Sequence, residues 1–363
     1  MTTRKMIQSV DVHAAGQVGR VVLGLDMRIR GATMADKLEF AKKNLDWLRR
    51  LILEELRGYP HLCAPIVVAP VNEDSHFGLI VMEQGGFRPM SGSNLICAVT
   101  AVVESGIIEV TEPESIIRVD TAVGLVEVNA TVTAGRVTKV TLRNVPGFVV
   151  ELDHVFDLPE YSPVKADIVF GGQFYVQTTA ENLGTELKPE NAREILRAGT
   201  VLRAAATAQY EVHHPENPNI RGVSLAMIHG PAISTDTNAT HTTIMPTGPV
   251  GLADSNTWDG ILDRSPCGTG TSARLAEMHA RGMIEPLEKY VVESLTGGRF
   301  TGAIFATNPA GNPPTITPEI SGRGWIISFQ QLVVESDDPF PEGFRLGDIW
   351  NTNREADNSL TAQ

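Results

Sequence analysis

Two short runs of the chain, near residues 90 and 266, carry residue types that can move protons. The first reads MSGSNLICAVTAVVESG from Met90 to Gly106, and the second reads PCGTGTSARLAEMHARG from Pro266 to Gly282. Each run opens with a small polar and glycine turn, continues as a predicted helix and ends at a glycine typical of a helix C-terminus. Ser91 and Cys267 hold the same place in the two runs, which indicates an internal repeat.

The start of a helix is suited to holding an anion beside such a residue. A helix N-terminus presents unpaired backbone N–H groups and a partial positive charge. We expect Gly92 and Ser93 in one copy, and Gly268 and Thr269 in the other, to direct N–H groups at a substrate carboxylate. The same field favours the thiolate of Cys267, so we expect a lowered pKa and a base at neutral pH without a metal.

Other interpretations of these residues stay open. Cys267 is alternatively a structural thiol, a protease-like nucleophile or part of a phosphate-binding loop. No histidine lies in a recognisable partner motif, and CGTGTS lacks the lysine of a P-loop. Ser91 is alternatively a helix N-cap. Asp263, four residues before Cys267, is either a solvated loop carboxylate or a group that binds the ammonium of an amino acid.

Composition and charge narrow the classes of function. The chain has 363 residues, of which 42% are apolar and 20% charged, typical of a globular protein with room for two domains. The net charge of −13 and the lack of a basic run argue against a nucleic-acid or anionic-membrane partner. No signal-peptide core or long apolar stretch is present, so we expect no membrane span and a cytoplasmic protein.

The cysteines indicate free thiols rather than a metal site. Cys63, Cys97 and Cys267 have no CxxC spacing and no accompanying set of histidines. An odd number of cysteines in a reducing compartment favours unpaired thiols. We expect Cys63 and Cys97 to be small buried residues.

The elements that would position the two runs can be placed coarsely. Thr33, with Asp36 three residues later, predicts a helix N-terminus, and Gly58 predicts its end. A second helix is predicted over 187–206, and strands with long turns over 230–260. The periodicity of the first helix depends on apolar residues three or four apart: Leu38, Ala41, Leu45, Leu48, Ile52 and Leu56.

Longer motifs resemble a known family. DRSPCGTGTSARLA, from Asp263 to Ala276, closely resembles the second catalytic motif of the proline racemase family, and MSGSN resembles the first, usually written Met-Cys-Gly-His. Further matches are DVHAAGQVGRVV over 11–22, FGGQFY over 170–175 and HPENPNIRGVS over 214–224. The resemblance covers nearly the whole chain.

The resemblance implies a fold and a division of the chain. The family fold is α/β (α+β), with two similar domains of the diaminopimelate epimerase-like fold. Each domain is a curved sheet around a central helix, and the active site lies in the cleft between them. Here 1–147, with a returning segment over about 325–353, forms the domain that carries Ser91. Residues 148–324 form the domain that carries Cys267.

The resemblance also implies roles for the site residues. In family racemases two cysteines flank the α-carbon, and one takes the proton while the other returns it from the opposite face. The matching catalytic positions here are Ser91 and Cys267, and Asp263 would hold the ring nitrogen. Loops near 170–175 and 219–224 are expected to read a ring hydroxyl. The backbone that would hold the carboxylate belongs to Gly92, Ser93, Gly268 and Thr269.

This sequence departs from the family pattern at two positions. Ser91 replaces the first cysteine, and Ser93 replaces the histidine two residues later. Because serine is a poor acid and base near neutrality, plain proline racemisation is the least favoured activity. In trans-3-hydroxy-L-proline the C2 hydrogen and C3 hydroxyl share one face. We therefore expect one-base dehydration to Δ1-pyrroline-2-carboxylate, with Cys267 as the principal base.

Two alternatives remain at this stage. The first is 2-epimerisation of trans-4-hydroxy-L-proline to cis-4-hydroxy-D-proline, on the same site. The second is an inactive protein that only captures imino acids. No metal, nicotinamide or flavin is implied, and an acid–base pair removes the need for pyridoxal phosphate. The expected partner is a small hydroxyproline; a homodimer is compatible with the sequence, which does not determine the assembly.

Overall fold

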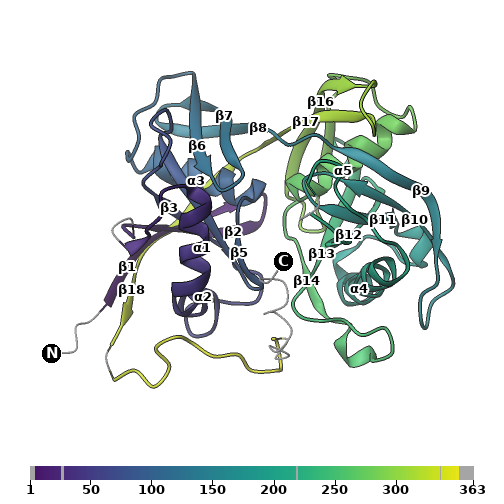
Figure 1. The fold of residues 1–363 in the computed structure, drawn as a ribbon, viewed down its shortest axis with the longest axis horizontal. Helices are drawn as coiled ribbons and strands as arrows, with labels where there is room; N and C mark the ends of the chain where they lie inside the picture. The colour runs from purple at the N-terminus through teal and green to yellow at the C-terminus, as the bar shows by residue number, and fades with distance from the viewer. Residues whose placement is uncertain (1–4, 26–27, 218–219, 336, 351–363) are drawn as a thin grey trace. The chain divides into compact units, whose positions relative to one another are not determined.

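The computed structural model describes residues 5–25, 28–217, 220–335 and 337–350 (Figure 1). The chain divides into two compact units. The first runs to Leu142 and resumes at Gly322, and the second spans Arg143–Ser321. Among the described residues, no helix is both long and apolar enough to cross a membrane.

The described residues of the first unit form three α-helices and nine strands. Its helices are α1 (Met34–Asn44), α2 (Asp46–Leu53) and α3 (Gly92–Glu104). Its strands are β1 (Lys5–Ala14), β2 (Gln17–Leu23), β3 (Ala64–Val68), β4 (Phe77–Glu83), β5 (Gly86–Arg88), β6 (Glu114–Thr121), β7 (Gly124–Thr133), β8 (Arg136–Arg143) and, after the second unit, β18 (Gly324–Val334).

Where the structure describes the second unit, its α-helices are α4 (Ala192–Gln209) and α5 (Gly268–Ala280). Its strands are β9 (Phe148–Phe156), β10 (Val164–Phe170), β11 (Phe174–Thr179), β12 (Leu225–Pro231), β13 (Ala239–Pro246), β14 (Gly260–Leu262), β15 (Tyr290–Glu293), β16 (Arg299–Asn308) and β17 (Thr315–Gly322).

The strands of the two units pair in the same order. In the first unit the order is β18, β1, β2, β3, β4, β6, β7, β8, with β5 beside β4. In the second it is β9, β10, β11, β12, β13, β15, β16, β17, with β14 beside β13. The parallel pairs also correspond, β2–β3 to β11–β12 and β4–β6 to β13–β15. The short sequence repeat is therefore part of a repeat of the whole topology.

The helices α3 and α5 occupy the same place in the two copies. Each follows the short strand beside β4 or β13, and both are visible among the strands of their units in Figure 1. Residues 94–103 of α3 and 270–278 of α5 are buried. Gly106 and Gly282, the predicted C-terminal glycines, have φ of +68° and +67°. Glycine adopts this left-handed conformation without steric cost, so both predicted helix ends are confirmed.

Two helix predictions need correction. Thr33 caps α1 through the predicted capping box with Asp36, but the predicted helix is divided at Leu45, which has φ −118°, and ends at Leu53 rather than at Gly58. The apolar residues of the periodicity are buried on both sides of the break, except Leu56, which lies beyond α2 and is 63% exposed. The second helix starts at Ala192, after a 3₁₀ turn over Pro189–Asn191. The residue before a proline disfavours helical backbone, and Lys188 is extended, with φ −131° and ψ 147°.

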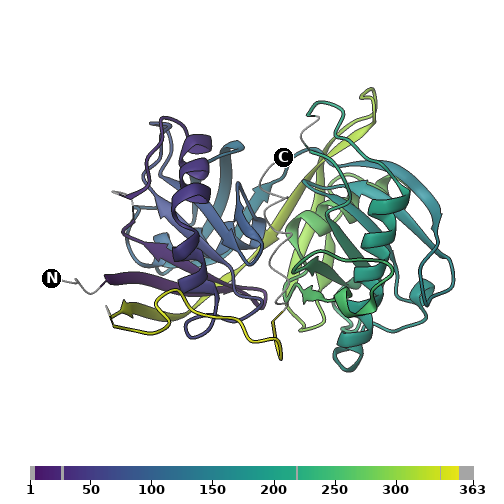
Figure 2. The same cartoon turned by 60° about the horizontal axis from the view of Figure 1, so that its bottom comes forward.

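The other helices cover the opposite sides of their sheets. In Figure 2, α1 and α2 lie along one side of the first unit's strands, and α4 lies along one side of the second unit's strands. The core of the first unit contains Leu48 and Ile52 from α2. The core of the second contains Ile195 and Leu202 from α4. This packing leaves the other side of each sheet to α3 or α5.

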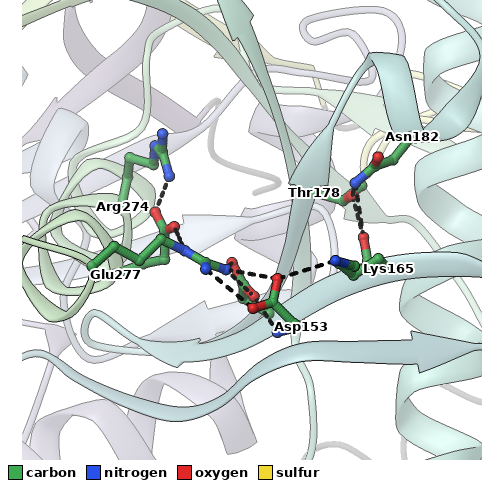
Figure 3. Close-up of polar contacts among 8 residues, drawn as sticks. Asp153, Lys165, Thr178, Asn182, Arg274 and Glu277 are labelled. Atoms are coloured by element: carbon green, nitrogen blue, oxygen red, sulfur yellow. Dashed lines mark hydrogen bonds and ion pairs between the residues drawn. The ribbon is translucent and has the colours of Figure 1, made fainter. Parts of the chain in front are cut away.

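The two central helices differ in what they bury. At matched positions, α3 carries Ala98 and Ala101 where α5 carries Arg274 and Glu277. Glu277 is only 2% exposed and accepts hydrogen bonds from Arg274 and Arg281 (Figure 3). Towards the surface, Arg281 donates to the Asp167 carboxylate at 2.8 and 2.9 Å and to the Asp153 carboxylate at 3.2 Å. Lys165 Nζ lies 3.8 Å from Asp153 Oδ1. This network ties α5 to β9 and β10.

Candidate active site

Cys267 immediately precedes the first turn of α5 in an unusual backbone conformation. Its φ is +65° with ψ 115°, a region that residues with side chains rarely adopt. The backbone N–H of Cys267 donates to the Ser265 hydroxyl at 3.1 Å, and Ser265 donates from its N–H and its hydroxyl to Asp263 Oδ1 at 2.8 and 2.9 Å. Strain of this kind is typical of functional sites. Asp263, 7% exposed, is therefore not a solvated loop residue but fixes the turn that carries Cys267.

Two hydroxyl groups lie beside the sulfur of Cys267. Tyr175 Oη is 3.4 Å from Cys267 Sγ, and Thr269 Oγ1 is 3.6 Å from it. The two hydroxyls also share a hydrogen bond of 2.6 Å. Tyr175 lies on β11 and is fully buried, while the sulfur side chain is partly exposed. The thiol thus has polar neighbours from the strand and from its own helix.

The structure overturns the expectation that the pKa of Cys267 is lowered. Burial raises its pKa first, and the negative charge of Asp263 raises it further. Hydrogen bonds from Tyr175, Thr269 and the Gly270 backbone lower the pKa, but they do not reverse the balance. Desolvation is the largest of these effects, because a buried thiolate loses its hydration. The balance therefore favours the thiol form of Cys267 over the thiolate.

Replacing Tyr175 by phenylalanine should raise the pKa of Cys267 further. The phenol donates to the charged form of the sulfur, so its loss disfavours the thiolate. We expect the pH midpoint for alkylation of Cys267 by iodoacetamide to move upward by about one unit, since hydrogen bonds to a charged group are among the stronger ones. In a chain that also carries Cys63→Ala, intact-mass spectrometry across about pH 8–11.5 measures this midpoint.

The matched control is Asp263→Asn, which should move the same midpoint downward. The asparagine removes the charge that raises the pKa but leaves an oxygen to accept from Ser265. Shifts of the same sign in both variants would contradict this assignment, because a general loosening of the turn hydrates the thiol in either case.

The glycines of FGGQFY explain how β11 approaches α5. A Cβ at Gly171 would lie 2.4 Å from both the Ala273 nitrogen and the Thr269 oxygen, so no side chain fits there. Asn144 joins the same contact by donating to the Gly171 carbonyl at 2.9 Å and to Ser272 at 3.0 Å. The close approach of this turn to α5 is what places Tyr175 beside Cys267.

Ser91 is the N-cap residue of α3 but does not cap it with its side chain. Its backbone is extended, with φ −156°, and its hydroxyl makes no capping hydrogen bond. Instead the amide of Asn94 donates to Ser91 Oγ at 3.0 Å. The alternative of a simple capping serine therefore does not hold. The partly buried hydroxyl keeps its own proton to donate elsewhere.

Both helix starts leave their first N–H groups without intrahelical acceptors, as predicted. The first α-helical bond is Leu95 N–H to the Ser91 carbonyl in one copy and Thr271 N–H to the Cys267 carbonyl in the other, both at 2.9 Å. The groups ahead of these bonds belong to the predicted carboxylate-binding residues Gly92, Ser93, Gly268 and Thr269. Their role in substrate binding stays a prediction.

The expectation that the loops near 170–175 and 219–224 read a ring hydroxyl stays a prediction, and the structure shows where their residues lie. Phe170 and Phe174 belong to the hydrophobic core, where their rings contact Phe148 and His214. Of 170–175, only Tyr175 reaches the polar neighbourhood of Cys267, because alternate strand residues face opposite sides of a sheet. In 219–224, Val223 is buried in the core, and Asn219 lies outside the described residues.

The remaining cysteines fit the sequence prediction. Cys63 and Cys97 are buried free thiols, and burial raises the pKa of Cys97 to about 12. Over the described parts of the chain, no group of three or more His, Cys, Asp or Glu side chains could hold a metal ion.

Comparison with known proteins gives full-length matches. A family model described as proline racemase matches residues 9–345. A 4-hydroxyproline 2-epimerase of Agrobacterium fabrum is 36% identical, over 96% of this chain and 98% of that protein. A proline racemase of Clostridioides difficile is 34% identical, over 95% and 100%. The solved structure of a hydroxyproline epimerase from Agrobacterium vitis, with bound trans-4-hydroxy-L-proline, aligns with a TM-score of 0.84 at 33% identity, covering 97% of this chain and 98% of that one.

Proposed function

We propose that this chain, which belongs to the proline racemase family, catalyses the 2-epimerisation of 4-hydroxyproline. The observation that carries the proposal is the pair of matched helix starts, one with Ser91 and one with Cys267, in a chain similar end to end to 4-hydroxyproline 2-epimerases. The similar solved structure holds trans-4-hydroxy-L-proline, which supports this substrate. Relative to the dehydration favoured by the sequence alone, the comparisons favour this alternative.

The proposed reaction exchanges protons at C2 on opposite faces. Cys267, as thiolate, takes the C2 proton and forms an S–H bond. The electron pair of the broken C–H bond moves into the carboxylate and gives an enediolate. Ser91 donates its hydroxyl proton to the other face of C2, the carboxylate re-forms, and water returns both side chains to their starting protonation states. The reverse reaction uses the same groups with their roles exchanged.

Binding of the substrate should help to charge Cys267. The N–H groups ahead of Thr271 and Leu95 are placed to hold the growing negative charge of the enediolate, as oxyanion donors do. The substrate's cationic ring nitrogen near Asp263 would offset the carboxylate charge that raises the pKa of Cys267. In this proposal the substrate itself lowers the cost of forming the thiolate.

Dehydration of trans-3-hydroxy-L-proline is the second candidate. The observation that favours it is Ser91, a poor acid and base in place of a second cysteine, because a one-base elimination needs Cys267 alone. Cys267 takes the C2 proton as the C2–H bond breaks and gives it to the C3 hydroxyl on the same face, so that the C3–O bond breaks and water leaves. The resulting enamine tautomerises to Δ1-pyrroline-2-carboxylate.

Chiral chromatography of purified protein incubated with each hydroxyproline tests the proposal. We expect trans-4-hydroxy-L-proline to yield cis-4-hydroxy-D-proline. Conversion of trans-3-hydroxy-L-proline alone would establish the dehydratase instead. Recovery of both compounds unchanged, with binding visible by calorimetry, would reduce the chain to an imino-acid binder.

A further inference from the structure

The polar neighbours of the two candidate catalytic residues come from different elements: from the helix in the first unit and from a strand in the second. In the first unit, the neighbour of Ser91 comes from the helix: Asn94 donates to Ser91 Oγ at 3.0 Å. In the second unit, a principal neighbour of Cys267 comes from the strand: Tyr175 Oη lies 3.4 Å from the sulfur. The helix position matching Asn94 is Gly270, which has no side chain.

The strand that faces Asn94 carries a glycine at the point of contact, which leaves room for the asparagine side chain. Gly19 on β2 lies below the first turns of α3, and a Cβ there would meet Asn94 Oδ1 at 3.0 Å and Cys97 Cβ at 3.0 Å. The first unit therefore places its polar side chain on the helix and glycine on the strand. The second unit places glycine on the helix and its polar side chain on the strand. A large residue on both elements would not fit.

From this arrangement we infer that Asn94 is a positioning residue that fixes Ser91 as the proton donor of the pair. The inference rests on the proposed function only in taking Ser91 as one of the two proton-transferring groups. An amide N–H can donate but cannot accept, so the Ser91 oxygen is held as an acceptor and its hydroxyl proton is left to point away from Asn94. The same N–H stabilises the alkoxide that forms when that proton leaves.

Burial strengthens this hydrogen bond. Asn94 is 2% exposed, so the amide that donates to Ser91 is itself shielded from water. Ser91 alone would be a far weaker acid than the cysteine that the family pattern places there. The amide donor increases the acidity of Ser91 by stabilising its alkoxide, just as Tyr175 and Thr269 favour the charged form of Cys267.

A thiol probe at position 91 tests the inference without relying on activity. In Ser91→Cys with Cys63→Ala and Cys267→Ala, the new thiol reports the local donor, while Cys97, with a pKa of about 12, stays unreactive. We expect the alkylation midpoint of residue 91 to rise by about one pH unit when Asn94 becomes Ala, and to rise further when it becomes Asp, which lacks the N–H and adds negative charge. Equal midpoints with Asn, Ala and Asp would overturn the inference.

A second variant covers the case in which changes at Asn94 prevent folding. Gly19→Ala keeps the amide but displaces it, because the added Cβ meets both Asn94 and Cys97. It should raise the same midpoint, and an unchanged or lowered midpoint would count against the role of Asn94.

Measurements of turnover distinguish failure of this inference from failure of the proposed function. In the otherwise unaltered chain, Asn94→Ala should lower kcat for epimerisation at least tenfold with little change in KM. Epimerisation at the full rate in this variant would overturn the inference. If the unaltered chain does not epimerise hydroxyproline, the proposed function fails, and the order of the alkylation midpoints still decides the role of Asn94.

Discussion

Cys267→Ala should abolish turnover of hydroxyproline, with a loss of about a thousandfold or more, the range expected when an acid–base group is removed from its reacting atom. The sulfur is the only thiol at either helix start, and its turn is fixed by Ser265 and Asp263 in a conformation with φ +65°. Neither neighbouring hydroxyl, Tyr175 nor Thr269, can replace it, because burial raises the pKa of Tyr175 well above its ordinary value. Chiral chromatography of product formation measures the loss.

The matched control is Cys63→Ala, which removes a buried thiol from the first unit and should leave turnover unchanged. Substrate binding by Cys267→Ala should persist, since the backbone N–H groups ahead of Thr271 remain. If Cys267→Ala kept its activity while Ser91→Ala lost it, the assignment of Cys267 as the principal base would be wrong.

Glu277→Ala should cost about 3–5 kcal/mol of unfolding free energy, the effect of leaving a buried charge without its partner. Glu277 on α5 is 2% exposed and accepts hydrogen bonds from Arg274, which is 9% exposed, and from Arg281 at the end of the helix (Figure 3). Its removal leaves the Arg274 guanidinium buried beside an alanine. Urea unfolding followed by circular dichroism measures the change.

Replacing both buried partners distinguishes this explanation from simple loss of packing. Arg274→Met with Glu277→Leu removes the two charges together and should recover most of the stability, because similar exchanges for apolar residues are often neutral or better. Asp153→Asn, at the solvent-exposed end of the cluster, should change stability much less. A double variant as unstable as Glu277→Ala would show that the apolar pair cannot fill the space.

The two helix starts can be predicted from the sequence because residues close to them in the chain determine them. The turn glycines, the C-terminal glycines 106 and 282 and the matched spacing of Ser91 and Cys267 are all local signals, and the structure places them as predicted. The full topological repeat is carried by strand pairings between distant segments. In the sequence, the repeat is recognised from the turn residues and the C-terminal glycines of the two matched runs.

The pKa of Cys267 could not be predicted from its own motif. Desolvation and the charge of Asp263, which raise this pKa, depend on how the folded turn buries the thiol. Tyr175 reaches the sulfur from a strand 92 residues away in sequence. Its signal lay in the FGGQFY alternation, where Phe174 enters the core and the next residue must face α5. Asn94 lies within the MSGSN motif, but its hydrogen bond to Ser91 is apparent only from the structure, where Ser91 makes no capping hydrogen bond.

The most direct test of the account is proton NMR of trans-4-hydroxy-L-proline with the enzyme in D₂O, read before equilibrium is reached. If Ser91 and Cys267 act on opposite faces of C2, the cis-4-hydroxy-D-proline that forms should carry deuterium at C2 while the remaining substrate keeps protium. Product that retains the substrate's own C2 proton, or deuterium entering the substrate with no epimer formed, would contradict a two-face pair.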